Sequence, residues 1–236
     1  MKKVKVKIIQ CGILDEPLNY NIIKKFKSSA FEITEVEEGV MLENMNNGYN
    51  YSTYEDNYWE NKIKGNDNIL TFVITNVQLE DNFYARHLNH KRVIFSFRQI
   101  LPYLTEKHIK LENVILKALY EYSLVFSELR KGYEELGIWH NETRGCLYDV
   151  DGVLSDIVRT CKEPKICVNC ESRLLQKGLS AKDIETVKQE LKKIKRSRFL
   201  DMYEWFQKHI ILSMFLGIVF SFILGLFTSF VYDLMK

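Results

Sequence analysis

Four residues between positions 140 and 170 have the types and the spacing of ligands for a metal ion. They are one histidine and three cysteines: His140, Cys146, Cys167 and Cys170. The last two form a Cys-x-x-Cys pair, whose turn presents two thiolates to one ion, and Pro164 stiffens the approach because its ring fixes φ. Zinc prefers four tetrahedral sulfur and nitrogen ligands. The pattern therefore predicts a closed, structural zinc site, with Cys161 as the substitute if His140 points elsewhere.

Three other interpretations of the cysteines stay open. Free cysteines are often small, buried hydrophobic side chains. Cys167 and Cys170 would be a redox pair in the second interpretation, although no thioredoxin-like strand–Cys-x-x-Cys–helix context surrounds them. Disulfides, the third interpretation, need an oxidising compartment, and the five cysteines of the chain would leave one over.

The composition predicts a folded chain rather than a disordered one. Of its residues, 46% are hydrophobic and 27% are charged, as in folded proteins. Its length of 236 residues is enough for one domain of about 200 residues and a tail. A formal net charge of +2 gives no reason to expect a nucleic-acid partner. Charged and apolar residues alternate at the start of the chain, so we expect no secretory signal peptide there.

The elements that must position the four ligands lie mostly before them in the chain. Val4, Val6 and Ile8 alternate with lysines, which is typical of a strand with one buried face. The predicted strands are residues 3–10, 31–36, 69–77 and 92–97, and the predicted helices are residues 18–28, 98–105 and 111–130. Strand, helix and strand in this order predict an α/β (α+β) fold.

Residues 40–67 are rich in Asn, Tyr and Glu and show no clear period. We interpret them as an irregular loop or a hairpin held by its own aromatic side chains. The alternative is a surface or peptide groove lined by Tyr49, Tyr51, Tyr54, Tyr58 and Trp59. Further on, we expect His87 and His90 to be exposed loop residues rather than metal ligands.

The stretch from Gly137 onward resembles the end of the archaemetzincin family of zinc proteases. Gly137-Ile138-Trp139-His140 matches the family's G-x-x-H, Cys146 falls at its second cysteine, and Cys167 and Cys170 match its C-x-x-C. The order of the preceding elements is also similar. The resemblance implies a zincin-like domain over residues 1–179 that contains the zinc knuckle, residues 140–170.

The departures from the family pattern concern catalysis. The catalytic H-E-x-x-H would begin ten residues before His140, where the chain has Arg130 and Lys131, with Glu134 in place of the second histidine. A catalytic zinc needs about three protein ligands, an open position and a general base. The resemblance therefore implies structural zinc and no catalytic residues. Asn141 replaces a family cysteine, so we hypothesise that His140 has moved into the structural zinc site.

The end of the chain predicts a membrane anchor. Ser180 can cap a helix over residues 181–200, and residues 180–208 are predicted to form an amphipathic, basic linker helix. Residues 210–232 then carry no charge, and a helix of this length spans about 34 Å, enough for the hydrocarbon core of a bilayer. A basic cluster precedes this single transmembrane helix: Lys192, Lys193, Lys195, Arg196 and Arg198. Positive residues stay inside, so the chain is predicted to be tail-anchored with a cytoplasmic domain.

Small residues recur every four positions within the predicted span: Ser213, Gly217, Ser221, Gly225 and Ser229. Such a stripe lets two helix backbones approach closely and predicts self-association.

These features together predict a binding, sensing or effector module at the membrane, with an unknown protein or ligand as partner. One alternative is a divergent membrane-bound metallohydrolase, which would need a second metal site that uses His87, His90 or Glu134. Another is an oligomerising effector that permeabilises membranes. A second, exchangeable metal would favour the hydrolase, and dye leakage that depends on residues 210–236 would favour the permeabiliser.

Overall fold

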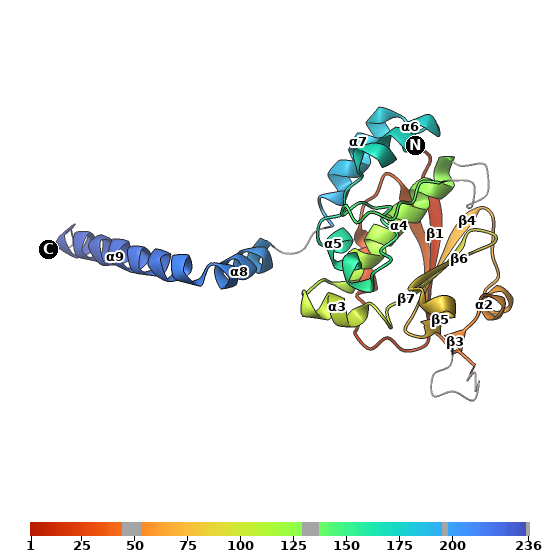
Figure 1. Ribbon diagram of the computed structural model, residues 1–236, viewed down its shortest axis with the longest axis horizontal. Coiled ribbons are helices and arrows are strands. Elements are labelled where there is room, and N and C mark those ends of the chain that lie inside the picture. Colours follow the sequence, from red (N-terminus) through yellow and green to blue (C-terminus); the bar gives the residue numbers. More distant parts are fainter. Residues whose placement is uncertain (44–52, 129–136, 195–197, 235–236) are drawn as a thin grey trace. The chain divides into compact units, whose positions relative to one another are not determined.

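The computed structural model describes residues 1–43, 53–128, 137–194 and 198–234. The chain divides into two compact units, Met1–Lys195 and Arg196–Lys236. The first unit holds all the strands that the described residues form, and the second holds the last two helices (Figure 1).

The described residues of the first unit form a five-stranded sheet in the order β2-β1-β4-β7-β6 (Figure 1). Its strands are β1 (Val4–Cys11), β2 (Phe31–Val40), β4 (Ile69–Thr75), β6 (Ala85–Leu88) and β7 (Arg92–Ser96). All neighbours pair in parallel except β6, which is antiparallel to β7. The four predicted strands are therefore confirmed, and β4 is a continuous apolar run because both of its faces are buried.

Helices α1 (Tyr20–Lys25), α3 (Leu101–Glu106) and α4 (Leu111–Glu128) belong to the larger of two cores. The long helix α4 contacts β1, β2 and β4, and Val114, Ile115 and Leu119, at the predicted apolar spacing, are fully buried, while Phe126 is partly buried. The spacing of three and four residues thus identified the helix correctly, but α4 is buried on nearly all sides, including at Tyr120 and Glu121, which lie off the predicted apolar stripe. The same face of the sheet supplies Val6, Ile8 and Phe72 to this core.

The opposite face of the sheet is covered by part of the stretch that the sequence left irregular. Helix α2 (Asp56–Lys62) and the two-residue strands β3 (Thr53–Tyr54) and β5 (Gln78–Leu79) lie there, in the described part of the chain. Trp59 is fully buried, and the rings of Tyr54 and Tyr58 pack on it with centroids 5.9 and 5.4 Å away. The loop prediction is therefore wrong for residues 53–62, because one buried tryptophan positions a helix too short to show a period. Tyr49 and Tyr51 lie outside the described residues.

The prediction that His87 is an exposed loop residue is also wrong. His87 lies in β6, its ring stacks on Phe126 at 5.3 Å, and burial lowers its pKa to about 4. Pairing with β7, which the sequence does not reveal, makes this four-residue segment a strand. His90 is exposed as expected, and its Nδ1 lies 3.0 Å from Asp67 Oδ1.

The last helices of the first unit are α5 (Ile157–Lys162), α6 (Val168–Gln176) and α7 (Ala181–Leu191), and single 3-10 turns cover Glu80–Asn82 and Leu154–Asp156. Ser180 caps α7 as predicted, because its Oγ accepts a hydrogen bond from Asp183 N at 3.1 Å. The predicted single helix over residues 181–200 is wrong, since α7 ends at Leu191. Ile184 and Val187 are fully buried in the larger core. The predicted domain boundary after residue 179 thus falls inside the first unit. A helix that packs on a core and a linker helix have the same amphipathic pattern, so the sequence could not distinguish them.

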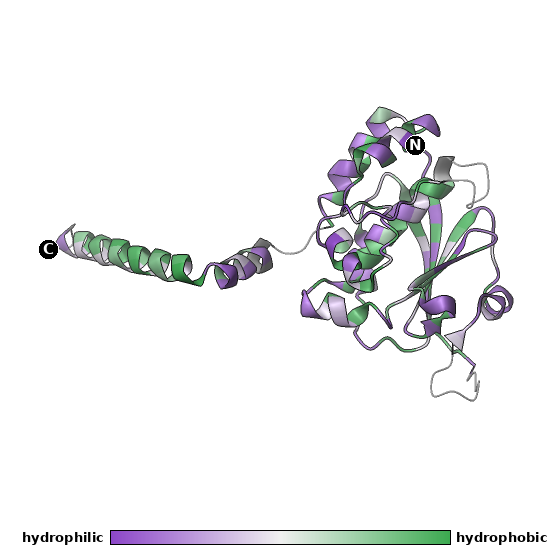
Figure 2. Ribbon diagram, in the orientation of Figure 1, coloured by the Kyte–Doolittle hydropathy of each residue, from purple (hydrophilic) through white to green (hydrophobic). Residues whose placement is uncertain are grey.

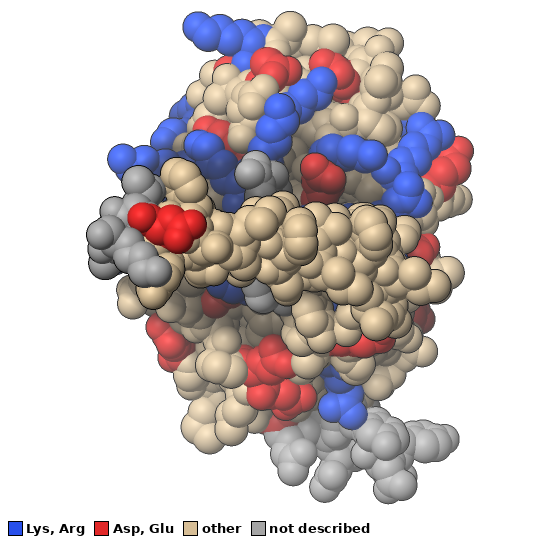
Figure 3. Space-filling model, turned by 90° about the vertical axis from the view of Figure 1, so that its left-hand side faces the viewer, with Lys and Arg blue, Asp and Glu red and all other residues tan. Residues whose placement is uncertain are grey.

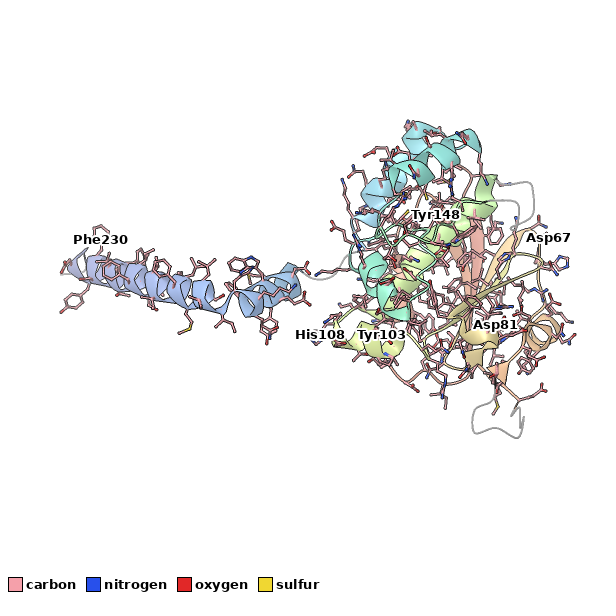
Figure 4. All side chains as sticks on the ribbon, in the orientation of Figure 1. Asp67, Asp81, Tyr103, His108, Tyr148 and Phe230 are labelled. Carbon is pink, nitrogen blue, oxygen red and sulfur yellow. The ribbon has the colours of Figure 1, made fainter. Side chains whose placement is uncertain are left out.

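The second unit consists of α8 (Arg198–Lys208) and α9 (Ile210–Leu234). Among the described helices, α9 is the one long and apolar enough to cross a membrane, and an 18-residue stretch within Ile210–Asp233 has a mean hydropathy of 2.7. Figure 2 shows α9 as almost uniformly hydrophobic, whereas α8 is mixed. In the view of Figure 3 the surface of α9 is uncharged except near its C-terminal end, and Phe230 points outward from it (Figure 4).

Candidate metal centre

Two short backbone pairings bring the predicted ligands together. His140 and Cys146 lie between α4 and α5, whereas Cys167 and Cys170 lie at the start of α6. His140 N donates to Tyr148 O at 3.1 Å, which folds the first segment back on itself. Leu147 N donates to Lys165 O at 2.6 Å, which joins that segment to the approach to α6. Residues 21 or more positions apart in the chain thus reach one place.

The geometry of the four donors fits a zinc ion. The ligand atoms of His140, Cys146, Cys167 and Cys170 all lie within 4.8 Å of one another. His140 Nε2 is 3.6 Å from Cys167 Sγ, and tetrahedral zinc with ordinary bond lengths separates a sulfur and a nitrogen ligand by about 3.6 Å. The predicted Cys3His cluster is therefore present and can hold zinc. Cys161 is not part of this group; it is fully buried in α5, where burial raises its pKa to about 12.

The surroundings favour the thiolate form of one cysteine of this cluster, Cys146. A hydrogen bond from the Cys170 thiol lowers the pKa of Cys146 to about 5, although burial acts in the opposite direction. The same bond, with burial, raises the pKa of Cys170. Cys167 is the N-cap of α6 and Cys170 lies in its first turn. Zinc requires its cysteine ligands to be deprotonated, so binding would release the remaining thiol protons.

A carboxylate that the sequence analysis missed links the two ligands of the first segment. Asp149 Oδ2 accepts hydrogen bonds from Arg144 N at 2.8 Å and Cys146 N at 2.9 Å, while Oδ1 lies 3.3 Å from His140 Nδ1. His140 Nδ1 also lies 3.0 Å from Glu142 O. Because Nε2 faces Cys167 Sγ, a zinc-bound His140 would carry its proton on Nδ1, toward these oxygens. The signal in the sequence was an acidic residue three positions after a candidate ligand.

The arrangement is that of a structural rather than a catalytic ion site. Four protein donors fill a tetrahedral shell and leave no position for water or substrate. The side chain of His140 is only 8% exposed, and Cys146 and Cys170 are buried. Ile138 O accepts from Cys170 Sγ at 3.5 Å and from Arg173 at 3.3 Å, which also tie this segment to α6. An ion here would cross-link the segment after α4 to α6.

The positions of the family's catalytic motif, Arg130, Lys131 and Glu134, lie outside the described residues. Within the described residues, the Cys3His cluster is the one group of three or more His, Cys, Asp or Glu side chains close enough to hold a metal. His87 and His90, proposed above for a second metal, do not belong to such a group there.

No family model matches the chain, and no curated protein matches its sequence. Among solved structures, the chain is similar to the archaemetzincin of Methanopyrus kandleri, with 16% sequence identity and a TM-score of 0.49. The match covers 74% of this chain and 95% of that chain. The likeness concerns the arrangement of the backbone and carries no information on activity.

Proposed function

We propose that this protein is a single-pass membrane protein whose first unit binds or senses a ligand and has no protease activity. One observation supports this most: all four donors of the Cys3His cluster are protein side chains, so the ion they could hold has a structural role. The sequence supports it as well, because Arg130, Lys131 and Glu134 replace the family's catalytic motif. Arginine and lysine side chains are poor zinc ligands.

Elemental analysis of the purified full-length chain tests the zinc part of the proposal. We expect one tightly held zinc per chain, reduced in His140→Ala and unchanged in His209→Ala, a matched change in the second unit. A metal-free chain, or a His140→Ala variant with unchanged zinc content and stability, would contradict the assignment. A second, exchangeable metal would favour the metallohydrolase instead.

The anchoring part of the proposal rests on α9 and on the charges before it. The helix is long enough to span a bilayer, and the basic residues before it, which include Lys192 and Lys193, support a cytoplasmic first unit by the positive-inside rule. We expect the full-length chain to stay in membranes during alkaline extraction, and the first unit to be digested by protease added to the cytoplasmic side. Extraction into the soluble fraction, or protection of the first unit, would refute this topology.

We further propose that two copies pair through the small-residue stripe of α9. A Cβ added at Gly217 or Gly225 would meet no atom within 4 Å, so both positions are open to a neighbouring helix. Gly217 and Ser213 also line a hollow of about 470 Å³ between Phe206 and Phe220, within the second unit. Replacing both glycines with Leu should weaken pairing in a membrane reporter assay, whereas Ile218→Leu should not; equal pairing of all variants would refute the stripe's role.

A further inference from the structure

A cavity of about 500 Å³ lies in the first unit between α4, the start of β6 and the segment that carries His140. Its wall includes the aromatic rings of Tyr84, Tyr122 and Trp139 and the carboxylates of Glu121 and Asp149. The described residues that line it include no Lys or Arg. The size and the mixture of rings with a few polar groups are typical of small-molecule sites.

Buried carboxylates outnumber buried cations beside this cavity. Glu121 Oε2 accepts from Lys117 Nζ at 2.9 Å, and both side chains are less than 10% exposed. Asp149 and Asp151 are 2% and 3% exposed; Asp151 Oδ1 accepts no hydrogen bond, and Asp149 Oδ1 lies 3.3 Å from His140 Nδ1. Of the described groups that line the cavity, Glu121 and Asp149 are carboxylates and none is a Lys or Arg, so a cation is favoured over an anion there.

The polar groups connect with one another around the cavity wall. Tyr84 OH donates to Asp151 Oδ2 at 3.3 Å, and Trp139 Nε1 donates to Glu121 Oε1 at 2.9 Å. These bonds hold two of the rings beside two of the carboxylates. A cation that lies over an aromatic face is attracted by the ring's electrons, and hydrogen bonds to charged groups are stronger than those between neutral groups.

We propose that this cavity binds a small organic ammonium ion. Its nitrogen would donate hydrogen bonds to Glu121 and Asp149, and its carbon skeleton would lie against Tyr122 and Trp139. The inference rests on the proposed binding role of the first unit and names the chemical class of the ligand. It requires no catalytic step.

Calorimetric titration of the full-length chain in non-ionic detergent micelles tests this, with benzylammonium as the probe and empty micelles as the blank. The neutral benzyl alcohol and the anionic benzoate have nearly the same shape, so they isolate the charge. We expect saturable binding of benzylammonium and at least about tenfold weaker binding of both others, because the charge-assisted hydrogen bonds are lost. Equal affinity for the alcohol, tighter binding of benzoate, or no saturable binding of the ammonium would overturn the proposal.

A double variant tests the location without leaving an unpaired buried charge. Lys117→Met with Glu121→Gln removes both members of the ion pair, a change that buried pairs often tolerate. We expect this folded variant to bind benzylammonium about tenfold more weakly, and Glu185→Gln, on the exposed side of α7, to bind as the parent does. Unchanged affinity in the double variant would overturn the assigned site. Zinc content and membrane extraction, measured on the same samples, report separately on the proposed function.

Discussion

Replacing Asp149 by Asn should weaken zinc binding although it removes no ligand. In the parent, Oδ2 accepts from two backbone N–H groups, at 2.8 and 2.9 Å, and Oδ1 lies 3.3 Å from His140 Nδ1. An asparagine has one acceptor oxygen and one NH2 group. If its oxygen keeps the backbone bonds, its NH2 faces the protonated Nδ1 of a zinc-bound His140. If it turns the other way, Arg144 N and Cys146 N lose their acceptor.

In either orientation the new NH2 group therefore faces another N–H group, beside His140 or beside Cys146, instead of an acceptor. Loss of such an outer partner typically lowers metal affinity about 10- to 100-fold, which is about 1.4–2.7 kcal/mol. Competition with a chromogenic chelator measures this affinity in the full-length chain. Asp156→Asn is the matched control, because its carboxylate accepts from Thr143 Oγ1 at 2.7 Å and touches neither His140 nor Cys146. An unchanged affinity in Asp149→Asn, or an equal loss in Asp156→Asn, would refute the reasoning.

Three further predictions concern the stability of the first unit, all measured by urea unfolding of the full-length chain. Ile184→Ala should cost about 2–5 kcal/mol because the side chain is fully buried, whereas Glu185→Ala, on the exposed side of α7, should cost little; a small effect of the first change would mean that α7 is not part of the core. Gly178→Ala should destabilise the fold by about 1–2 kcal/mol because φ is +103° there, while Gly152→Ala, where φ is not in the left-handed region and a Cβ would meet nothing, should not; equal effects would contradict this. Burial raises the pKa of Asp151 from 3.8 to about 6, so the folded state binds this proton more tightly, and stability should fall by up to about 3 kcal/mol as the pH rises from about 4 to about 6. His87, with a lowered pKa of about 4, acts with the opposite sign in that range, so the difference between the parent and Asp151→Asn is the quantity to measure; no difference in its pH dependence would contradict the prediction.

The sequence identified elements well where burial imposes a period over many residues. Lysines alternate with apolar residues in β1, and α4 repeats apolar residues at three and four positions, so both elements were predicted, β1 with its correct buried face, whereas α4 is buried on nearly all sides. Prediction from the sequence failed where an element is short or depends on pairing with a segment distant in the chain. Helix α2 contains one buried residue, Trp59, and β6 exists because Ala85–Leu88 pairs with β7. Neither a single buried residue nor a strand pairing produces a periodic pattern of apolar residues in the sequence.

Helix α7 illustrates a different limit. Its apolar side and basic side were recognised, but an amphipathic helix has the same pattern whether it packs on a core or lies along a membrane. The ion pair of the Met1 amino group with Asp183 Oδ1, at 3.0 Å, and the bonds of Glu190 to Ser29 and Tyr120 bind α7 to the first unit. These partners lie 70 or more positions away in the chain.

The sequence by itself determined three of the metal donors, Cys146, Cys167 and Cys170, and the apolar character of α9, because both depend on residue type and on spacing along the chain. Tertiary structure alone decided that His140 rather than Cys161 joins the other cysteines. It also decided that Asp149 contacts both His140 and the backbone of Cys146, and that a cavity lined by Glu121 and Asp149 lies beside them. Distances between side chains from separate segments follow from how the sheet and helices pack, and packing is set by the whole core at once.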